Sequence, residues 1–320
     1  MKLSEIYELA IKTGIANDPR GKKEVERTLK NAKKTFDGLK GDEKKEFDQE
    51  KLINPYSDTR ILFGAPDLEV KTVLTGIDIE VGEVLLADRL REKGRPIDLI
   101  IAHHPEGKAL AELSEVMGMQ AEIMEIFGVP INVGEGLMAP RIGEVKRSLM
   151  PLNHNKAIDA ARILDIPMMC VHTPADNMVT TAVQNIIDKK DPITVGDVVK
   201  ILKDIPEFAE GVKTGAGPTV VTGDKDRKCG KVFVDMTGGT GGSEDSFAKL
   251  SQAGVGTIVC MHIGEKHRKE AEKNHINVII AGHMASDSMG MNLILDEIAK
   301  QGVDIIPCSG LTRFSRIKAK

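Results

Sequence analysis

Two adjacent histidines at the end of an apolar run are the first residues in this sequence that could bind a metal. Leu99–Ala102 is a continuous apolar segment of strand length, and His103 and His104 follow it directly. Pro105 then ends the strand because it has no N–H group to donate. Successive side chains of an extended segment point to opposite sides. The pair therefore suits two neighbouring ions with one imidazole each, or one ion if the strand twist relaxes. The alternative is a partly exposed pair in a loop.

Two further strand-like runs end in a histidine that is followed four residues later by an aspartate. These pairs are His172 with Asp176, and His283 with Asp287. Each pair precedes a segment predicted to be helical, and the N-terminus of a helix favours a negative side chain. Because ligands of an open parallel sheet bind at the carboxyl ends of its strands, we expect these side chains and the histidine pair to converge at one edge.

The donor types indicate which metals such a site would hold. Imidazole and carboxylate ligands without cysteine favour Zn, Mn or Fe(II) over a closed thiolate site. Four histidines and two aspartates exceed the needs of one catalytic zinc ion. They suit a centre of two divalent ions with a shared carboxylate and a bridging water. The remaining histidines lack this context and are interpreted as surface or capping residues, although His262 and His267 could also reach the site.

Two other features could contribute to a reaction at this edge. Glu106 is a candidate general acid, general base or substrate contact, and an exposed loop acid is the simpler interpretation. The segment Thr237–Asp245 (TGGTGGSED) lies between a predicted strand and a predicted helix, a geometry that can bind phosphate through backbone N–H groups. It matches neither a Walker loop nor a dinucleotide fingerprint, so a tight structural turn is an equal alternative. Its candidate binding residues are Gly238, Gly239, Gly241, Gly242 and Ser243.

Composition excludes several classes of protein. The 320 residues are 41% hydrophobic, enough for a sizeable core, and the formal net charge is -4. Basic residues alternate with acidic ones and only 3% of residues are aromatic, which argues against a nucleic-acid partner. The four cysteines show no CxxC spacing and are interpreted as buried free thiols. No segment is apolar enough to span a membrane or to act as a signal peptide, so a cytoplasmic protein is expected.

The alternation of strand-like and helical patterns predicts an α/β fold with two linked lobes, whose mainly parallel or mixed sheets are flanked by helices. Residues 1–64 are predicted to form a charged helical N-terminal extension that packs on the main body or on another subunit. A first α/β half is expected over 65–190 and carries the histidine pair and the first His–Asp pair. A connecting helix and turn follow over 191–228. A second half over 229–320 carries the glycine-rich segment and the second His–Asp pair. Within the first half, VPINVG (129–134) is expected to be a strand.

With these motifs in one order, the chain resembles the NIF-three-like family from about Val70 to Pro307. The matching segments are GIDIE, LIIAHHP, HTPADN, TGGTGGS and IIAGHMASD. The resemblance implies a two-metal centre between two α/β lobes and a ring-shaped hexamer assembled from dimers. Members of the family are often assigned by similarity to a type of GTP cyclohydrolase. Others are described as partners of transcription or other regulatory proteins.

The resemblance also implies a set of ligands in this chain. They are His103, His104, Asp176, His283 and Asp287, with His172 as a further ligand or as a group behind the ligands. In this family the last motif usually ends in Glu, whereas here it ends in Asp287, which is one methylene shorter. The shorter reach could weaken or shift one of the two metal ions.

The leading hypothesis is a hydrolase that uses two divalent ions and a bridging water on a small phosphorylated or nucleotide-like substrate. The scarcity of aromatic residues gives only modest support to a purine nucleotide as the substrate. The alternative is a non-catalytic, metal-binding oligomeric scaffold or regulatory interaction protein, in which protein side chains can fill every coordination position. A metal storage or chaperone role agrees less well with six ligands fixed at strand ends.

Overall fold

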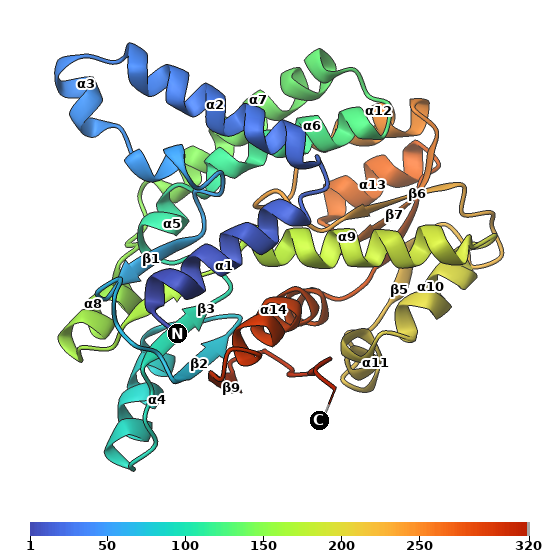
Figure 1. Cartoon of the computed structure of the whole chain (residues 1–320). Coiled ribbons are helices and arrows are strands. Elements are labelled where there is room, and N and C mark those ends of the chain that lie inside the picture. The colour runs from blue at the N-terminus through green and yellow to red at the C-terminus, as the bar shows by residue number, and fades with distance from the viewer. Residues whose placement is uncertain (319–320) are drawn as a thin grey trace.

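Two β-sheets organise the chain, and helices cover both faces of each sheet (Figure 1). The computed structural model describes residues 1–318. The first sheet has the strand order β1-β4-β3-β2-β9 and the second β5-β8-β7-β6. The predicted α/β architecture of two lobes with mixed sheets is therefore confirmed. The strands are β1 Arg60–Phe63, β2 Thr72–Gly76, β3 Leu99–Ala102, β4 Met168–Cys170, β5 Thr219–Thr222, β6 Lys231–Asp235, β7 Val255–Cys260, β8 Asn277–Ile280 and β9 Asp304–Cys308.

The apolar run before the histidine pair forms β3, the central strand of the first sheet. It pairs in parallel with β2, where Val73 lies opposite Leu99, and with β4, where Ile100 lies opposite Met168. β9 adds to β2 in parallel, and β1 adds to β4 in the antiparallel direction. All four residues of β3 are buried, as expected for a strand covered on both faces.

Two long helices, α9 and α14, lie between the two sheets. Helices α4, α5 and α8 pack on the outer face of the first sheet, and α6, α7, α12 and α13 on the outer face of the second. Side chains of α9 and α14 contribute to the hydrophobic cores of both inner faces, which α1 completes on one side and α10 and α11 on the other. The helices are α1 Leu3–Ala16, α2 Lys22–Gly38, α3 Gly41–Glu46, η1 Gln49–Leu52, α4 Val81–Glu92, α5 Gly107–Ala111, η2 Leu113–Gly118, α6 Met119–Ile126, α7 Ile131–Leu149, α8 Lys156–Ile163, α9 Thr173–Lys190, α10 Val195–Lys203, α11 Pro206–Lys213, α12 Ser246–Gln252, α13 Glu265–Lys273 and α14 His283–Ala299.

The structure differs from the sequence-based expectations in several places. The strand predicted over 129–134 is wrong, because Ile131 begins helix α7 and Pro130 occupies the position just before it. A short apolar run fits a buried strand or a buried helix equally well, and only packing decides between them. Strand β1 lies inside the segment expected to be helical. Strand β9, near the C-terminus, returns to the first sheet rather than extending the second.

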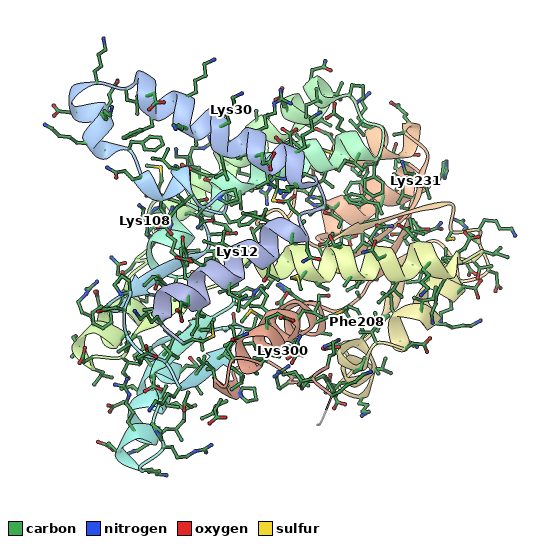
Figure 2. All side chains as sticks on the ribbon, in the orientation of Figure 1. Lys12, Lys30, Lys108, Phe208, Lys231 and Lys300 are labelled. Carbon is green, nitrogen blue, oxygen red and sulfur yellow. The ribbon has the colours of Figure 1, made fainter. Side chains whose placement is uncertain are left out.

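The N-terminal helices differ in how they contact the body. On α1, Leu3, Ile6 and Ala10 are buried in the core that covers the first sheet. On α2 only Val25 is buried, and Lys30 points to solvent (Figure 2). Within the described residues, no helix has the length and apolar character needed to cross a membrane.

Helices α9 and α14 approach each other closely at a glycine. A Cβ atom added at Gly290 of α14 would lie 2.3 Å from the backbone oxygen of Ala175 in α9, which is far inside van der Waals contact. Only glycine therefore allows this separation of the two helices. The contact lies in the first turn of α9 and about two turns into α14, close to the two His–Asp pairs.

We expect Gly290→Ala to lower the free energy of unfolding by about 1–3 kcal/mol, because the methyl group forces the two helices apart. Gly136→Ala is the matched control. Gly136 is an exposed residue of α7, and a Cβ atom added there would have open space around it among the described residues. The control is expected to be neutral or stabilising by up to about 1 kcal/mol through helix propensity. Urea unfolding measures both variants, and equal stability of Gly290→Ala and the wild type would contradict the steric argument.

Candidate metal centre

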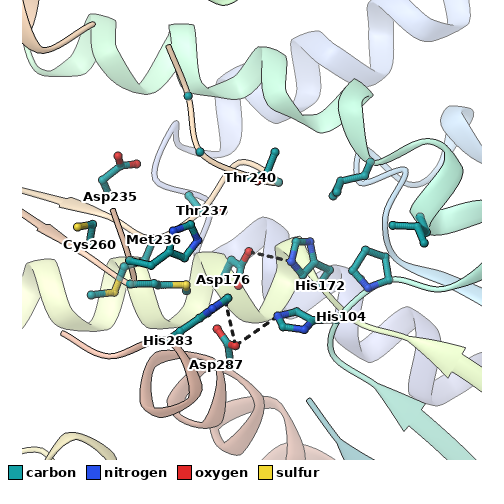
Figure 3. Close-up of a pocket in the computed structure, with 18 of the residues that line it drawn as sticks. His104, His172, Asp176, Asp235, Met236, Thr237, Thr240, Cys260, His283 and Asp287 are labelled. Carbon is teal, nitrogen blue, oxygen red and sulfur yellow. Dashed lines mark ion pairs between the residues drawn. The ribbon is translucent and has the colours of Figure 1, made fainter. Parts of the chain in front are cut away.

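The six residues singled out as candidate ligands lie together between the two lobes. His103 and His104 follow β3, at the carboxyl end of the first sheet. The other four lie at the starts of the two central helices, which point toward this edge of the sheet (Figure 3). His172 precedes α9 with Asp176 in its first turn, and His283 begins α14 with Asp287 one turn later. The spacing of four residues puts each histidine and its aspartate on one helix face.

The first group of donor atoms surrounds His103. Its Nε2 atom lies 3.5 Å from Asp176 Oδ1 and 3.5 Å from Asp287 Oδ1. His172 Nε2 lies 3.7 Å from Asp176 Oδ2. These three histidine and carboxylate groups, His103, His172 and Asp176, each offer an atom within 4.8 Å of the others.

The second group surrounds the other oxygen of Asp287. His104 Nε2 lies 3.5 Å from Asp287 Oδ2, and His283 Nε2 lies 3.4 Å from the same atom. His103, His104 and Asp287 likewise each offer a donor atom within 4.8 Å of the other two. Asp287 is therefore the residue that faces both groups, one oxygen toward each.

These distances fit two donors on one metal ion better than a hydrogen bond. They exceed the usual N–H···O distance. Two ligands at about 2.1 Å from a tetrahedral ion stand about 3.4 Å apart. Several of the atoms involved are buried and have no hydrogen-bond partner among residues 1–318, namely His103 Nε2, Asp176 Oδ1 and both oxygens of Asp287. Buried polar atoms are costly unless they are paired or coordinate a metal, so the donor set fits divalent cations.

A second ring of acceptors fixes the imidazoles so that Nε2 faces the cluster. The Nδ1 atom of His103 donates to Val171 O at 3.0 Å, and that of His104 to Asp78 Oδ1 at 2.6 Å. His172 Nδ1 donates to Asp58 Oδ2 at 2.8 Å. Since these oxygens can only accept, each Nδ1 carries a proton, and Nε2 is the ring atom left to bind a metal. Sequence reasoning missed both aspartates, because no spacing relates them to the histidines they bind.

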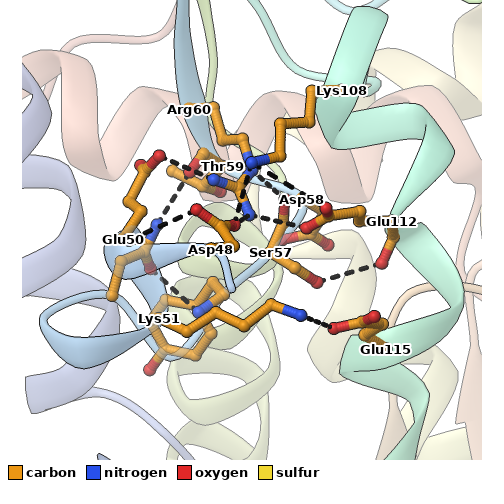
Figure 4. Close-up of polar contacts among 12 residues, drawn as sticks. Asp48, Glu50, Lys51, Ser57, Asp58, Thr59, Arg60, Lys108, Glu112 and Glu115 are labelled. Atoms are coloured by element: carbon orange, nitrogen blue, oxygen red, sulfur yellow. Dashed lines mark hydrogen bonds and ion pairs between the residues drawn. The ribbon is translucent and has the colours of Figure 1, made fainter. Parts of the chain in front are cut away.

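The segment that carries Asp58 is held by a buried arginine (Figure 4). Arg60 has only 3% of its side chain exposed and pairs with Glu50 at 2.6 Å, Asp48 at 2.5 Å and Glu112 at 2.7 Å. Two of these carboxylates come from the N-terminal segment and the third from the residue between α5 and η2. The N-terminal segment expected to be a charged extension therefore also positions a hydrogen-bond acceptor of the cluster.

In the cluster, burial and nearby opposite charges shift the pKa values of the carboxyl and imidazole groups in opposite directions. Burial raises the pKa of Asp176 to about 6, although His172 and His103 oppose the rise. For Asp287, burial is outweighed by His103 and His104, which hold the pKa of this carboxyl below its usual range. Burial lowers the pKa of His172, but Asp176 and Asp58 outweigh it and raise the pKa to about 9.

The cluster opens into a cavity with a volume of about 390 Å³, a size suited to a small ligand. Leu110, Leu113, Met236 and Met261 form apolar parts of its wall. Glu106 also lines it, and burial, with Glu80 as the next cause, raises the pKa of this carboxyl to about 7. An acid with this pKa can exchange a proton near neutral pH.

The glycine-rich segment forms another wall of the cavity, and side chains from outside hold its carbonyl groups. Gln120 donates to the carbonyls of Gly238 and Thr240, each at 2.6 Å, and Arg141 donates to that of Gly241 at 2.9 Å. The residues of the segment that reach the cavity are Thr237, Gly239, Thr240, Gly241 and Gly242. Gly238 and Ser243 do not line this cavity.

The two histidines that sequence reasoning left open have different positions. His262 lines the cavity beside His283, with ring centroids 4.9 Å apart. His267 lies outside this cavity, and its Nε2 atom pairs with the carbonyl oxygen of Gly242 at 2.9 Å. His262 is therefore adjacent to the cluster, whereas His267 supports the glycine-rich segment.

Comparison with known proteins agrees with this fold. No protein-family model and no curated protein matches the sequence. Among solved structures, a NIF3 superfamily protein from Sphaerobacter thermophilus is 28% identical, with a TM-score of 0.69 over 80% of this chain and 92% of that chain. Reduced HcgD from Methanocaldococcus jannaschii is 16% identical, with a TM-score of 0.48 over 77% of this chain and 87% of that chain.

A Bacillus cereus protein related to NIF3 is more distant, at 15% identity and a TM-score of 0.39 over 82% of this chain and 92% of that chain. The comparison rests on the Sphaerobacter protein, because it shares both the fold and more than a quarter of the aligned residues. Together with the ordered motifs, this similarity supports a NIF3-like family for the chain.

Proposed function

We propose that this protein is a divalent-metal-dependent hydrolase that acts on a small phosphorylated or nucleotide-like substrate. The observation that carries the proposal is a set of unpartnered imidazole and carboxylate atoms that opens into a cavity of small-molecule size. A metal-binding scaffold would need the ligands but not the cavity. The cavity therefore favours the hydrolase over a scaffold.

The donor groups suggest how two ions would be held. One ion would be bound by His103, His172 and Asp176, and the other by His104 and His283, with one oxygen of Asp287 for each. Zn, Mn and Fe(II) all accept such ligands. When bound, two such ions would polarise a phosphoryl oxygen and lower the pKa of water to near neutrality.

The remaining roles follow from the walls of the cavity. Glu106 is the proposed general acid or base, since it lines the cavity and its pKa is raised to about 7. No lysine or arginine lines the cavity within the described residues. A phosphate group would therefore depend on the metal ions and on backbone N–H groups of Gly239, Gly241 and Gly242, whose neighbouring carbonyls are held from outside. The homo-oligomer implied by the family resemblance remains a prediction.

Metal analysis of protein purified without chelator, combined with a hydrolysis screen, tests the proposal. We expect about two divalent ions per chain and turnover of p-nitrophenyl phosphoesters or nucleotides that EDTA abolishes and added Zn²⁺, Mn²⁺ or Fe²⁺ restores. If two ions are bound but no substrate is turned over, the scaffold hypothesis replaces the hydrolase hypothesis. Protein without bound metal, and without affinity for added metal, would overturn both.

Single substitutions should separate the two ions. Asp176→Ala removes a donor from one group only and is expected to cost about one ion per chain, whereas Asp287→Ala removes the residue that faces both and should cost both. Asp188→Ala, an exposed aspartate on the same helix as Asp176, is the matched control with unchanged metal content. Equal metal loss in the Asp176 and Asp287 variants would refute the shared role of Asp287.

Asp58→Asn tests the outer ring. Asp58 Oδ2 accepts from His172 Nδ1 and Thr173 Oγ1. The amide keeps the size of the side chain but removes its negative charge. We expect the dissociation constant of the bound metal to rise by about 10- to 100-fold. Competition with a fluorescent chelator measures this change, with Asp188→Asn as the control. An unchanged constant would mean that His172 needs no negatively charged partner.

A further inference from the structure

One carboxylate that lines the cavity lies outside the metal cluster and forms no ion pair with any of the described residues. The cavity is lined by four carboxylates, from Glu106, Asp176, Asp235 and Asp287. Asp176 and Asp287 belong to the cluster, where imidazoles face them. Glu106 lies in the field of Lys156. Asp235 is left with the charge of His267 as its one favourable electrostatic partner within the described residues.

The position of Asp235 makes it accessible to a ligand. It is the last residue of β6, at the carboxyl end of the second sheet, and its side chain is solvent-accessible because it faces the cavity. Figure 3 shows Asp235 beyond Met236 and Cys260, away from the cluster formed by His104 and Asp287. The cavity thus has metal donors on one side and a separate carboxylate on the other.

The surroundings of Asp235 are unfavourable to its charge. Cys260 lies opposite Asp235 in the neighbouring strand, and Met236 and Met261 line the same cavity; thiol and thioether groups stabilise a carboxylate poorly. Burial accordingly raises the pKa of Asp235 to about 6, and only His267 opposes the rise. An uncompensated carboxylate lowers stability at neutral pH, and residues that do so are typical of binding sites.

We propose that Asp235 is a specificity-determining residue that binds an amidine-like N–C–N group of the substrate, in which two N–H donors on one carbon meet the two carboxylate oxygens. The proposal rests on the proposed function, because it assigns the far end of a substrate whose reacting group lies at the metal cluster. Carboxylates pair with such forked donors through two parallel, charge-assisted hydrogen bonds. Inside a cavity such a pairing is stronger than in bulk water, because the local dielectric is lower.

Binding of benzamidine and its neutral analogue benzamide to the metal-loaded protein at pH 7.5 tests this assignment. Both probes have a ring that suits the thioether wall, but only benzamidine presents two N–H donors and a positive charge. Titration calorimetry of the wild type is expected to give at least about tenfold tighter binding of benzamidine. Asp235→Asn should reduce that ratio to about twofold or less.

Glu106→Gln is the matched control, since it neutralises another carboxylate of the same cavity and should leave the ratio within about twofold of the wild type. Asp235→Asn should also unfold no more readily than the wild type at pH 7.5, because it removes an unpaired charge rather than a contact. A ratio that is unchanged in Asp235→Asn, or equally lost in Glu106→Gln, would overturn the assignment, as would a wild type that does not discriminate between the probes.

The readout is independent of turnover. If benzamidine selectivity depends on Asp235 and no substrate is hydrolysed, the hydrolase proposal fails and the binding role of Asp235 stands. If hydrolysis is found and selectivity does not depend on Asp235, the hydrolase proposal stands and the binding role of Asp235 fails.

Discussion

The close contact between α9 and α14 is the constraint on which the candidate site depends. Each helix begins with a histidine and carries an aspartate one turn later, so the separation of the helices sets the separation of the two carboxylates. Gly290 permits the backbone of α14 to reach the carbonyl of Ala175. The same two helices fill the space between the sheets, which ties the geometry of the cluster to the packing of both hydrophobic cores.

Burying carboxylates and imidazoles at this junction costs free energy, and the fold compensates for it in layers. The inner groups face one another, and the outer Nδ1 atoms bind Val171, Asp58 and Asp78. Asp58 in turn belongs to a segment fixed by Arg60 and its three acidic partners. A buried ion pair is a poor source of stability but an effective way to fix orientation. A continuous set of contacts therefore connects the N-terminal segment, through Asp58 and the histidines, to the start of α14.

The inner shell could be predicted from sequence, and the outer shell could not. The four-residue spacing after two strand-like runs, and the paired histidines after a third, carry a local signal for a shared sheet edge. Asp58 and Asp78 carry no such signal, because they meet His172 and His104 only through the pairing of distant strands. The two-lobed α/β fold followed from the alternation of patterns. The first turns of the helix at 131–149 were missed because its first residues form a short apolar run that also suits a strand.

The shorter acid at position 287 can be understood from the same packing. Family resemblance leads one to expect a glutamate there, and an aspartate reaches one methylene less far. Asp287 nevertheless has one oxygen 3.5 Å from His103 Nε2 and the other 3.5 Å from His104 Nε2, so its reach suffices. It lies on the helix face one turn after His283, and Gly290 lets α14 approach α9 without a steric barrier. With α14 packed this closely against α9, the aspartate side chain is long enough to face both histidines.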